Sequence, residues 1–225
     1  MTIYPTAIAP GARDHTGIGK MDFRLKATFE TYHERMREEH AALPVAPPGG
    51  RDGGEDQRMR AIGPETGQLL NILARSIESP TILELGTSFG YSGIWLGEAA
   101  RASGGRLITM ERHEYKSAYA REMSEKSGLS DVIDFRVGDA VSMIAKIEGG
   151  FDFVFVDLWK DLYVACLEAF YPKLNPGAII VADNMIMPGS DEVKAYARAI
   201  RAKPGITSVL LPVGSGIEVS RFAAA

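Results

Sequence analysis

Short apolar runs and longer amphipathic segments alternate along the chain. An apolar run that ends at a polar or turn residue indicates a buried strand, and apolar residues that recur every three or four positions indicate a helix. Strands are predicted at Thr81–Leu85, Arg106–Met110, Val132–Val137, Phe151–Val156, Ala178–Ala182, Ile206–Leu211 and Ile217–Phe222. Helices are predicted at Lys20–Leu43, Thr66–Ile77, Tyr91–Ala102, Glu114–Ser127, Ala140–Ile147, Asp161–Tyr171 and Asp191–Lys203.

The alternation of strands and helices after Pro64 predicts the fold class. Strand–helix repeats of this length are typical of a Rossmann-like, doubly wound α/β domain with a mostly parallel sheet. The last two predicted strands are joined only by Pro212–Gly216, whereas parallel strands need a longer crossover. We therefore predict a seven-stranded sheet whose last strand is antiparallel, preceded by an N-terminal helical extension.

The chain is expected to divide into an extension, residues 1–58, and the α/β domain, residues 59–225. Gly, Pro and Ala without periodicity predict a mobile start over residues 1–19. Pro44 ends the first predicted helix because proline cannot continue a helix. Residues 44–56 are rich in Pro and Gly and predict a loop. Such a loop is either a lid over the following domain or a plain linker, and the linker is the more ordinary interpretation.

Composition and charge argue against several classes of protein. The 225 residues suit one α/β domain, and the formal net charge of −4 gives no general reason to expect a nucleic-acid or anionic-membrane partner. No apolar stretch approaches the roughly 20 residues of a membrane span, and the N-terminus lacks a signal-peptide pattern. The single cysteine, Cys166, lies on a predicted helix face and is expected in the core. We therefore expect a cytoplasmic protein without an intramolecular disulfide.

Three consecutive predicted strands end in residues that suit a nucleotide-like cofactor. The first is followed by Gly86 and Gly90, which let the backbone approach a ligand or simply form a tight structural turn, the more ordinary interpretation of a lone glycine pair. Their spacing differs from the Gly-x-Gly-x-x-Gly of dinucleotide enzymes and argues against NAD. Glu111 ends the second strand, where an acid can bind the hydroxyls of a ribose or simply start the next helix. Asp139 follows Gly138 after the third strand. It can accept a hydrogen bond from an adenine amino group, cap the next helix, or do both.

The next two strands end in oxygen-bearing side chains. Asp157 follows one strand, and Asp183 with Asn184 follows the other. Ligands of open α/β sheets bind outside the carboxyl ends of the strands. Carboxylate and amide oxygens suit Mg²⁺, which keeps coordination positions for water and substrate oxygens. Lys160, one helical turn after Asp157, is a candidate proton acceptor, although an Asp–Lys pair is also an ordinary solvated pair at a helix start.

The ends of the first three strands together resemble class I S-adenosylmethionine-dependent methyltransferases. With the next two strand ends added, residues from about 59 to 222 resemble the metal-dependent O-methyltransferases of the catechol and caffeoyl-CoA type, most closely the catechol branch. The motifs that carry the resemblance are Leu85-Gly86…Gly90-Tyr91-Ser92, Leu107–Glu111, Phe155–Tyr163 and Ala182-Asp183-Asn184…Pro188-Gly189. Four separated motifs in the right order argue against chance agreement.

The resemblance implies roles for individual residues. Asp157, Asp183 and Asn184 would hold Mg²⁺ or another divalent cation, and Lys160 would be the catalytic base. Substrate contacts are implied for Lys160, Asn184 and Pro188. Contacts with S-adenosyl-L-methionine are implied for Glu84, Gly86, Gly90, Tyr91, Ser92, Glu111, Arg112, Gly138, Asp139, Ala140, Asp157 and Trp159.

The activity implied by the resemblance is Mg²⁺-dependent methylation of one hydroxyl of a catechol-type vicinal diphenol, by a monomer or a homodimer. The alternatives are O-methylation of a caffeoyl-CoA-like ester or of a hydroxylated tRNA base, and a cofactor-binding protein without catalysis. Retention of Lys160 and the three metal-binding side chains argues against the last alternative. The chain departs from the catechol branch at Leu158, where that branch has histidine. It also lacks a tryptophan before the domain and an alignable acid for the second hydroxyl.

Overall fold

The computed structural model describes residues 21–41 and 55–224. The predicted mobile start lies outside the described residues, and so does the predicted loop at residues 44–56 apart from its last two residues. The predicted boundary between residues 58 and 59 stays a prediction. Within the described ranges, no helix is both long enough and apolar enough to cross a membrane.

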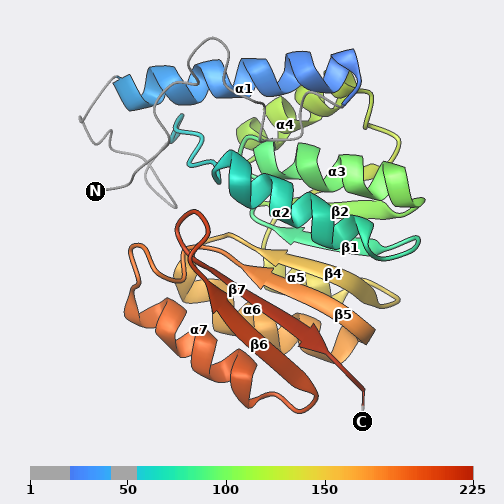
Figure 1. Cartoon of the computed structure of the whole chain (residues 1–225), viewed down its shortest axis with the longest axis vertical. Coiled ribbons are helices and arrows are strands. Elements are labelled where there is room, and N and C mark those ends of the chain that lie inside the picture. Colours follow the sequence, from blue (N-terminus) through green and yellow to red (C-terminus); the bar gives the residue numbers. More distant parts are fainter. Residues whose placement is uncertain (1–20, 42–54, 225) are drawn as a thin grey trace.

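A mixed sheet forms the centre of the described chain (Figure 1). Its strands are β1 (Thr81–Leu85), β2 (Arg106–Glu111), β3 (Ile133–Val137), β4 (Phe151–Val156), β5 (Leu174–Ala182), β6 (Ile206–Leu211) and β7 (Ile217–Phe222). Their order across the seven-stranded sheet is β3-β2-β1-β4-β5-β7-β6. Strands β1 to β5 run parallel, whereas β7 is antiparallel to both of its neighbours. The predicted fold class is confirmed.

Helices cover both faces of this sheet (Figure 1). They are α1 (Phe23–Ala41), α2 (Pro64–Arg75), α3 (Tyr91–Ser103), α4 (Glu114–Ser127), α5 (Ala140–Ala145), α6 (Tyr163–Phe170) and α7 (Asp191–Ala202). Helices α2, α3 and α4 pack on one face, and α5, α6 and α7 pack on the other. Cys166 is buried on α6, as expected.

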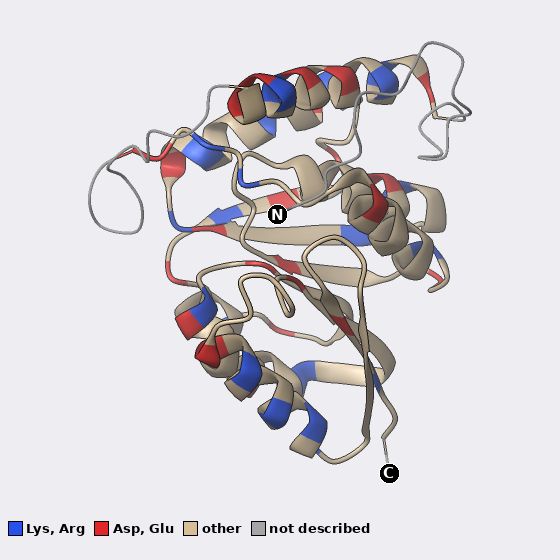
Figure 2. Ribbon diagram, turned by 60° about the vertical axis from the view of Figure 1, so that its left-hand side comes forward, with Lys and Arg blue, Asp and Glu red and all other residues tan. Residues whose placement is uncertain are grey.

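The N-terminal helix α1 forms an additional layer over α3 and α4 (Figure 1). It buries Leu25, Phe29 and Tyr32 against them, and the Phe29 ring lies 4.4 Å from the Trp95 ring between centroids. Its other side carries acidic and basic residues (Figure 2). The predicted helical extension therefore packs on the domain rather than standing apart from it.

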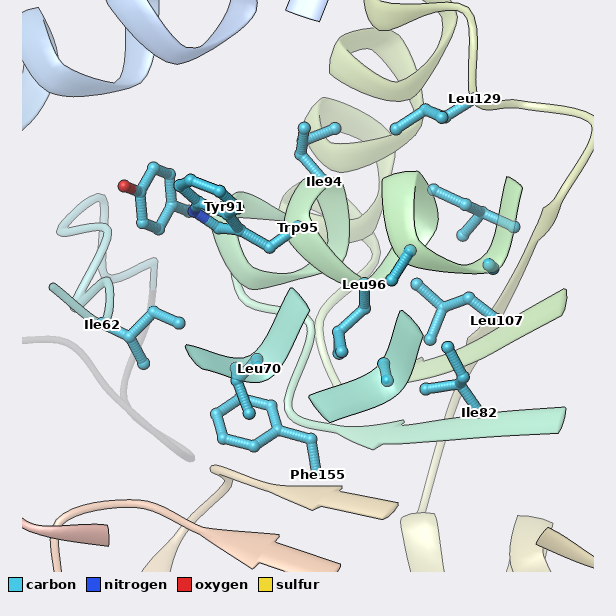
Figure 3. Close-up of a cluster of buried hydrophobic side chains, with 14 of the residues drawn as sticks. Ile62, Leu70, Ile82, Tyr91, Ile94, Trp95, Leu96, Leu107, Leu129 and Phe155 are labelled. Atoms are coloured by element: carbon cyan, nitrogen blue, oxygen red, sulfur yellow. The ribbon is translucent and has the colours of Figure 1, made fainter. Parts of the chain in front are cut away.

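Successive residues of the central strands enter the cores on opposite faces of the sheet. In β4, Phe153 and Phe155 join the core under α2 and α3, and Val154 and Val156 join the core under α6 and α7. Figure 3 shows part of the first core, where Phe155 lies beside Leu70 of α2. Burial on both faces explains why these strands are continuous apolar runs rather than alternating patterns.

Most predicted elements differ from the observed ones by one to four residues at an end, and two of these differences concern the surroundings of the predicted site. Strand β5 begins at Leu174, four residues before the predicted start, because a register shift between β4 and β5 accommodates Pro176 and Gly177. The segment predicted as a helix from Asp161 begins as a single 3₁₀ turn, Lys160–Leu162, and becomes α-helical only at Tyr163. That turn places the side chain of Lys160 differently from a regular first helical turn.

The strand register brings four predicted site positions to one edge of the sheet. Gly86 N donates to the carbonyl of Met110, which precedes Glu111. Asp157 N donates to the carbonyl of Leu85, and Asp183 N donates to the carbonyl of Val156. The carboxyl ends of β1, β2, β4 and β5 therefore lie side by side, as the parallel topology requires.

Candidate active site

A cavity of about 440 Å³ opens at this edge of the sheet. Its wall includes eleven of the residues predicted for the site, namely Gly86, Glu111, Arg112, Gly138, Asp139, Ala140, Asp157, Trp159, Lys160, Asn184 and Pro188. A much smaller cavity shares Gly86 and Asp157 with it and is also lined by Tyr91 and Ser92. Most of the residues predicted to bind cofactor, metal and substrate thus line two neighbouring cavities at this edge of the sheet.

The carboxylate of Glu111 is held by the backbone at the wall of this cavity. Ser88 N donates to Oε2 at 2.8 Å, and His113 N donates to Oε1 at 3.0 Å. Each carboxylate oxygen keeps a further lone pair for another donor. A fixed acid of this kind suits the paired hydroxyls of a ribose.

Asp139 has a local structural role beside its place on the cavity wall. Its side chain accepts a hydrogen bond from Ser142 N at 2.8 Å and so caps α5. This bond lowers the pKa of the Asp139 carboxyl, and the residue lines the cavity as an ionised acceptor. Capping and a contact with an amino group of a ligand are compatible, because the carboxylate has two oxygens.

The two glycines of the turn after β1 are required by packing. Gly86 has a φ of 102°, and a Cβ at this position would overlap the carbonyl oxygen of Asp157. Gly90 has a φ of 93°, and a Cβ there would lie 2.7 Å from the Cβ of Ala120. Gly86 lines the cavity, whereas Gly90 lines neither of the two cavities. Gly90 therefore acts on the site through the packing of α3 against α4.

Asp157, Asp183 and Asn184 lie at the adjacent ends of β4 and β5. Asp183 is buried and accepts a hydrogen bond from Ser215 Oγ at 2.6 Å. Asn184 has a left-handed φ of 61°, and its amide nitrogen donates to the same Ser215 Oγ at 3.0 Å. Because the nitrogen branch is engaged by Ser215, the oxygen branch of Asn184 is available at the cavity that the residue lines.

The surroundings of Asp157 and Asp183 disfavour the ionised form of both carboxyl groups. Burial raises the pKa of Asp157 to about 7, and Asp183 adds to this rise, whereas the nearby Lys160 ammonium opposes it. Burial likewise raises the pKa of Asp183, although the hydrogen bond from Ser215 lowers it in part. Two such acids beside an amide oxygen fit a divalent cation, which would stabilise their ionised forms.

No group of three His, Cys, Asp or Glu side chains that could hold a metal occurs among the described residues. The predicted metal ligands do not form such a group, because the third of them, Asn184, is an asparagine. Carboxylate and amide oxygens are ligands for Mg²⁺, which commonly takes only one or two carboxylates from the protein. The metal therefore stays a prediction, and the oxygen donors of Asp157, Asp183 and Asn184 are suited to it.

Lys160 lies between the predicted metal side and α6. Its Nζ donates to Asp157 Oδ1 at 2.9 Å and to Tyr163 Oη at 2.8 Å. The side chain is 24% exposed and lines the cavity. The Asp–Lys pair is therefore not an exposed pair at a helix start, but a partly buried pair on the cavity wall.

Glu84 and Asp183 are predicted site residues that do not line the large cavity. Glu84 is fully buried on β1, where Thr109 Oγ1 donates to its Oε2 at 2.6 Å. Its Oε1 has no hydrogen-bond partner among the described residues. Burial raises the pKa of Glu84 to about 7 despite the hydrogen bonds from Ser92 and Thr109. Glu84 thus links β1 to Thr109 of β2 and to Ser92 at the start of α3.

The raised pKa of Glu84 predicts a pH dependence of stability. Between pH 4.5 and about 7 the folded protein keeps a proton that the unfolded chain has lost, so the free energy of unfolding falls as pH rises through this window. The loss is at most about 3 kcal/mol, at 1.36 kcal/mol per pKa unit. Urea unfolding of the ligand-free protein at pH 5 and pH 8 is expected to show a smaller decrease for Glu84→Gln than for wild type. Equal decreases would contradict the prediction.

Part of the cavity wall comes from residues that the sequence did not predict for the site. Asp56 and Arg60 from the segment before α2, and Tyr115 and Lys116 from the start of α4, also line it. Asp56 is buried and pairs with the guanidinium groups of Arg58 and Arg60 at 2.8 and 2.9 Å. No local motif marks these residues, although the cluster of charges after the Pro/Gly-rich loop is visible in the sequence.

Helix α1 holds this missed segment in place. Both carboxylate oxygens of Glu39 accept a hydrogen bond from Met59 N at 3.0 Å. Arg35 donates to the carbonyl of Gln57, and its guanidinium lies 4.1 Å from the centroid of the Phe89 ring. Ser88 Oγ of the glycine turn donates to the carbonyl of Met59 at 2.9 Å. The cavity wall is thus tied both to α1 and to the turn after β1.

Replacing Glu39 by alanine is therefore expected to weaken binding of the predicted cofactor. The Met59 amide would lose its acceptor, which costs about 1 kcal/mol and corresponds to a roughly fivefold higher dissociation constant. Turnover at saturating cofactor should change little. Isothermal titration with S-adenosyl-L-methionine measures the effect, and Glu38→Ala, at an exposed position of the same helix, is the matched control. Equal affinities of the two variants would refute a role of the Glu39–Met59 hydrogen bonds in binding.

A family model and known proteins match the chain. A model described as an O-methyltransferase family matches residues 55–222. A catechol O-methyltransferase of Niastella koreensis is 35% identical over 133 residues, which cover 57% of this chain and 60% of that protein. A caffeoyl-CoA O-methyltransferase 1 of Eucalyptus globulus is 29% identical over 179 residues, which cover 70% and 72% of the two chains. The match thus spans less than two thirds of the first relative.

Solved structures agree with these matches. The crystal structure of an O-methyltransferase from Bacillus cereus, in complex with SAH, superposes with a TM-score of 0.70. The two chains are 26% identical, and the match covers 90% of this chain and 91% of the other. The similarity in fold therefore extends over most of both chains.

Proposed function

The chain belongs to the O-methyltransferase family, and on this premise we propose that it transfers a methyl group from S-adenosyl-L-methionine to one hydroxyl of a catechol-type vicinal diphenol, with Mg²⁺ or another divalent cation. The observation that carries the proposal is the meeting of Asp157, Lys160 and Asn184 with Glu111 and Asp139 on one cavity. A base and a cofactor cradle that share one space can hold two reactants in contact.

The cofactor, when bound, supplies an electrophilic methyl group on a sulfonium. Glu111, fixed by two backbone amides, is placed to accept hydrogen bonds from the ribose hydroxyls. Asp139 offers an acceptor to the adenine amino group, and the 41% exposed Trp159 offers an aromatic wall. A smaller neighbouring cavity, lined by Tyr91 and Ser92, shares Gly86 and Asp157 with the large one.

Asp157, Asp183 and Asn184 would hold the divalent cation. When bound, such a cation supplies a Lewis acid that lowers the pKa of a coordinated hydroxyl. Asp157 contributes a carboxylate at the cavity, Asn184 an amide oxygen, and Asp183 a buried carboxylate that Ser215 orients. Three protein ligands leave positions for two vicinal substrate oxygens and a water molecule.

Lys160 is the group on the cavity wall that can remove the hydroxyl proton. A neutral phenol is a weak nucleophile near pH 7, so a positioned acceptor is needed, and the neutral amine of Lys160 can take that role. Pro188, also on the wall, closes the substrate side with Asn184. The hydroxyl proton would therefore pass to the amine nitrogen of Lys160, on the side of the cavity wall that also carries Asp157.

The proposal is tested with purified protein, S-adenosyl-L-methionine, MgCl₂ and a panel of vicinal diphenols. We expect mass spectrometry to show one added methyl group, with no product in excess EDTA and recovery on adding Mg²⁺. Absence of product from every diphenol would refute the substrate class. Full turnover in chelator would refute the metal.

Relatives of the caffeoyl-CoA type favour one alternative substrate class. The match to the Eucalyptus globulus enzyme covers more of this chain than the match to the catechol enzyme, at lower identity. Lys116 on the cavity wall would suit an anionic substituent, whereas the Arg60 guanidinium is already paired with Asp56 at 2.9 Å. A caffeoyl-CoA-like ester and total tRNA therefore belong in the same assay, and the highest kcat/KM decides the substrate class.

A further inference from the structure

We propose that Tyr163 is a positioning residue that fixes the orientation of Lys160, an inference that rests on the proposed function of this site. Tyr163 is fully buried and opens α6, directly after the 3₁₀ turn that begins with Lys160. It does not line the cavity, so it acts on the reaction only through its neighbour.

The geometry around the Lys160 nitrogen carries the inference. The nitrogen is tetrahedral, and one of its four directions is the bond to the side chain. A second direction is taken by Asp157 Oδ1 at 2.9 Å and a third by Tyr163 Oη at 2.8 Å. One direction is left, and Lys160 lines the cavity where a substrate hydroxyl would lie. The two hydrogen bonds therefore aim the nitrogen at the substrate.

Tyr163 is itself fixed on two sides. Its hydroxyl donates to the main-chain carbonyl of Asp183 at 3.1 Å, which leaves the oxygen lone pairs to accept from Lys160. Its ring packs edge-on against Tyr196 of α7, with centroids 5.3 Å apart and an interplanar angle of 77°. The phenol thus connects the base on the β4 side to the end of β5, which carries Asp183 and Asn184.

This connection sets the distance between the base and the side chains on β5. A lysine side chain has four rotatable bonds, and it exchanges between rotamers unless its ammonium or amine end is held by other groups. Asp157 alone would allow the nitrogen to rotate about a single contact. The second contact with Tyr163 restricts it to one position, and a misplacement of about 1 Å can cost a hundredfold in rate.

The test uses Tyr163→Phe, which keeps the ring and removes only the hydroxyl. We expect kcat for the methylated diphenol to fall about 10- to 100-fold, with KM and the cofactor dissociation constant changed by less than about threefold. Tyr196→Phe is the matched control, because it removes the same group from the adjoining buried ring, and it should keep wild-type kcat. Equal kcat values for the two variants would overturn the proposal.

A second pair of variants separates positioning from general destabilisation. If Tyr163 acts through Lys160, adding Tyr163→Phe to a Lys160→Met background should change the residual turnover by less than about twofold. A further loss as large as that in wild type would contradict the inference. When Tyr163→Phe alone is too unstable to assay, the double variant is compared with Lys160→Met alone, and a further loss of more than about tenfold would contradict the inference.

Crystal structures of the variants provide a readout independent of turnover. Lys160 Nζ should occupy one position beside Asp157 in wild type and Tyr196→Phe, and should leave that position in Tyr163→Phe. An unmoved nitrogen would overturn the proposal. If wild type methylates no diphenol, the proposed substrate fails, but this structural comparison still decides the role of Tyr163.

Discussion

Replacing Lys160 by methionine is expected to lower kcat for a vicinal diphenol by about 10²- to 10⁴-fold, the range that a positioned proton acceptor contributes. Methionine keeps most of the apolar stem and removes the amine. The dissociation constant of S-adenosyl-L-methionine should change by less than about threefold, because Lys160 contacts Asp157 and Tyr163 rather than Glu111. Steady-state kinetics and isothermal titration measure the two quantities separately.

The chain offers a matched control for this substitution. Lys194 and Asp191 form a second pair with the same spacing of three residues, at 3.2 Å, but both side chains are mostly exposed. Lys194→Met should leave kcat unchanged, since an exposed pair contributes little. If Lys160→Met turned over like Lys194→Met, Lys160 would not be the base.

Much of the site follows from the sequence because parallel strands end at the same edge. Phe151–Val156 is a continuous apolar run, so its end at Asp157 is marked by a change of polarity. Glu111 is placed by the same argument at the end of β2, next to β1. Once the strands alternate with helices, the fold itself brings these ends together. The pattern of apolar and polar residues in a single sequence is enough to locate these strand ends.

Residues that reach the site through tertiary contacts were not predictable in this way. Ser215 lies in the turn between β6 and β7 and contacts Asp183 and Asn184 only because β7 returns beside β5. Glu39 reaches Met59 across 20 residues because α1 packs on the domain. Neither position shows a periodicity or a motif that would reveal its partner.

Local turn chemistry also misplaced one boundary. Asn175-Pro176-Gly177 predicts a break before the fifth strand, because proline cannot donate to a strand ladder. The structure retains the strand through this stretch with a shifted register against β4. The pairing of Val154, Phe155 and Val156 with Ile180–Ala182 keeps Asp157 and Asp183 adjacent despite the irregularity.

Asp157→Asn is expected to remove most activity by removing the divalent cation. The substitution keeps the shape of the side chain but replaces an ionised ligand by a neutral one beside buried Asp183. The Lewis-acid contribution of a metal is several kcal/mol, so kcat should fall by about 10³-fold. Titration with Mn²⁺, followed by the loss of the free-ion electron paramagnetic resonance signal, should show binding in wild type and none in the variant.

The exposed Lys194–Asp191 pair again supplies the comparison, since Asp191→Asn makes the same chemical change where the side chain is 97% exposed. This control should bind Mn²⁺ and turn over like wild type. Circular dichroism of both variants checks that the fold is kept. We expect it to be kept in Asp157→Asn, because burial already disfavours the ionised form of Asp157 and raises its pKa to about 7. Retained Mn²⁺ binding by Asp157→Asn would exclude Asp157 as a ligand. Lost activity with retained binding would instead assign its effect to the contact with Lys160, at 2.9 Å. The two measurements thus separate a metal ligand from a partner of the base.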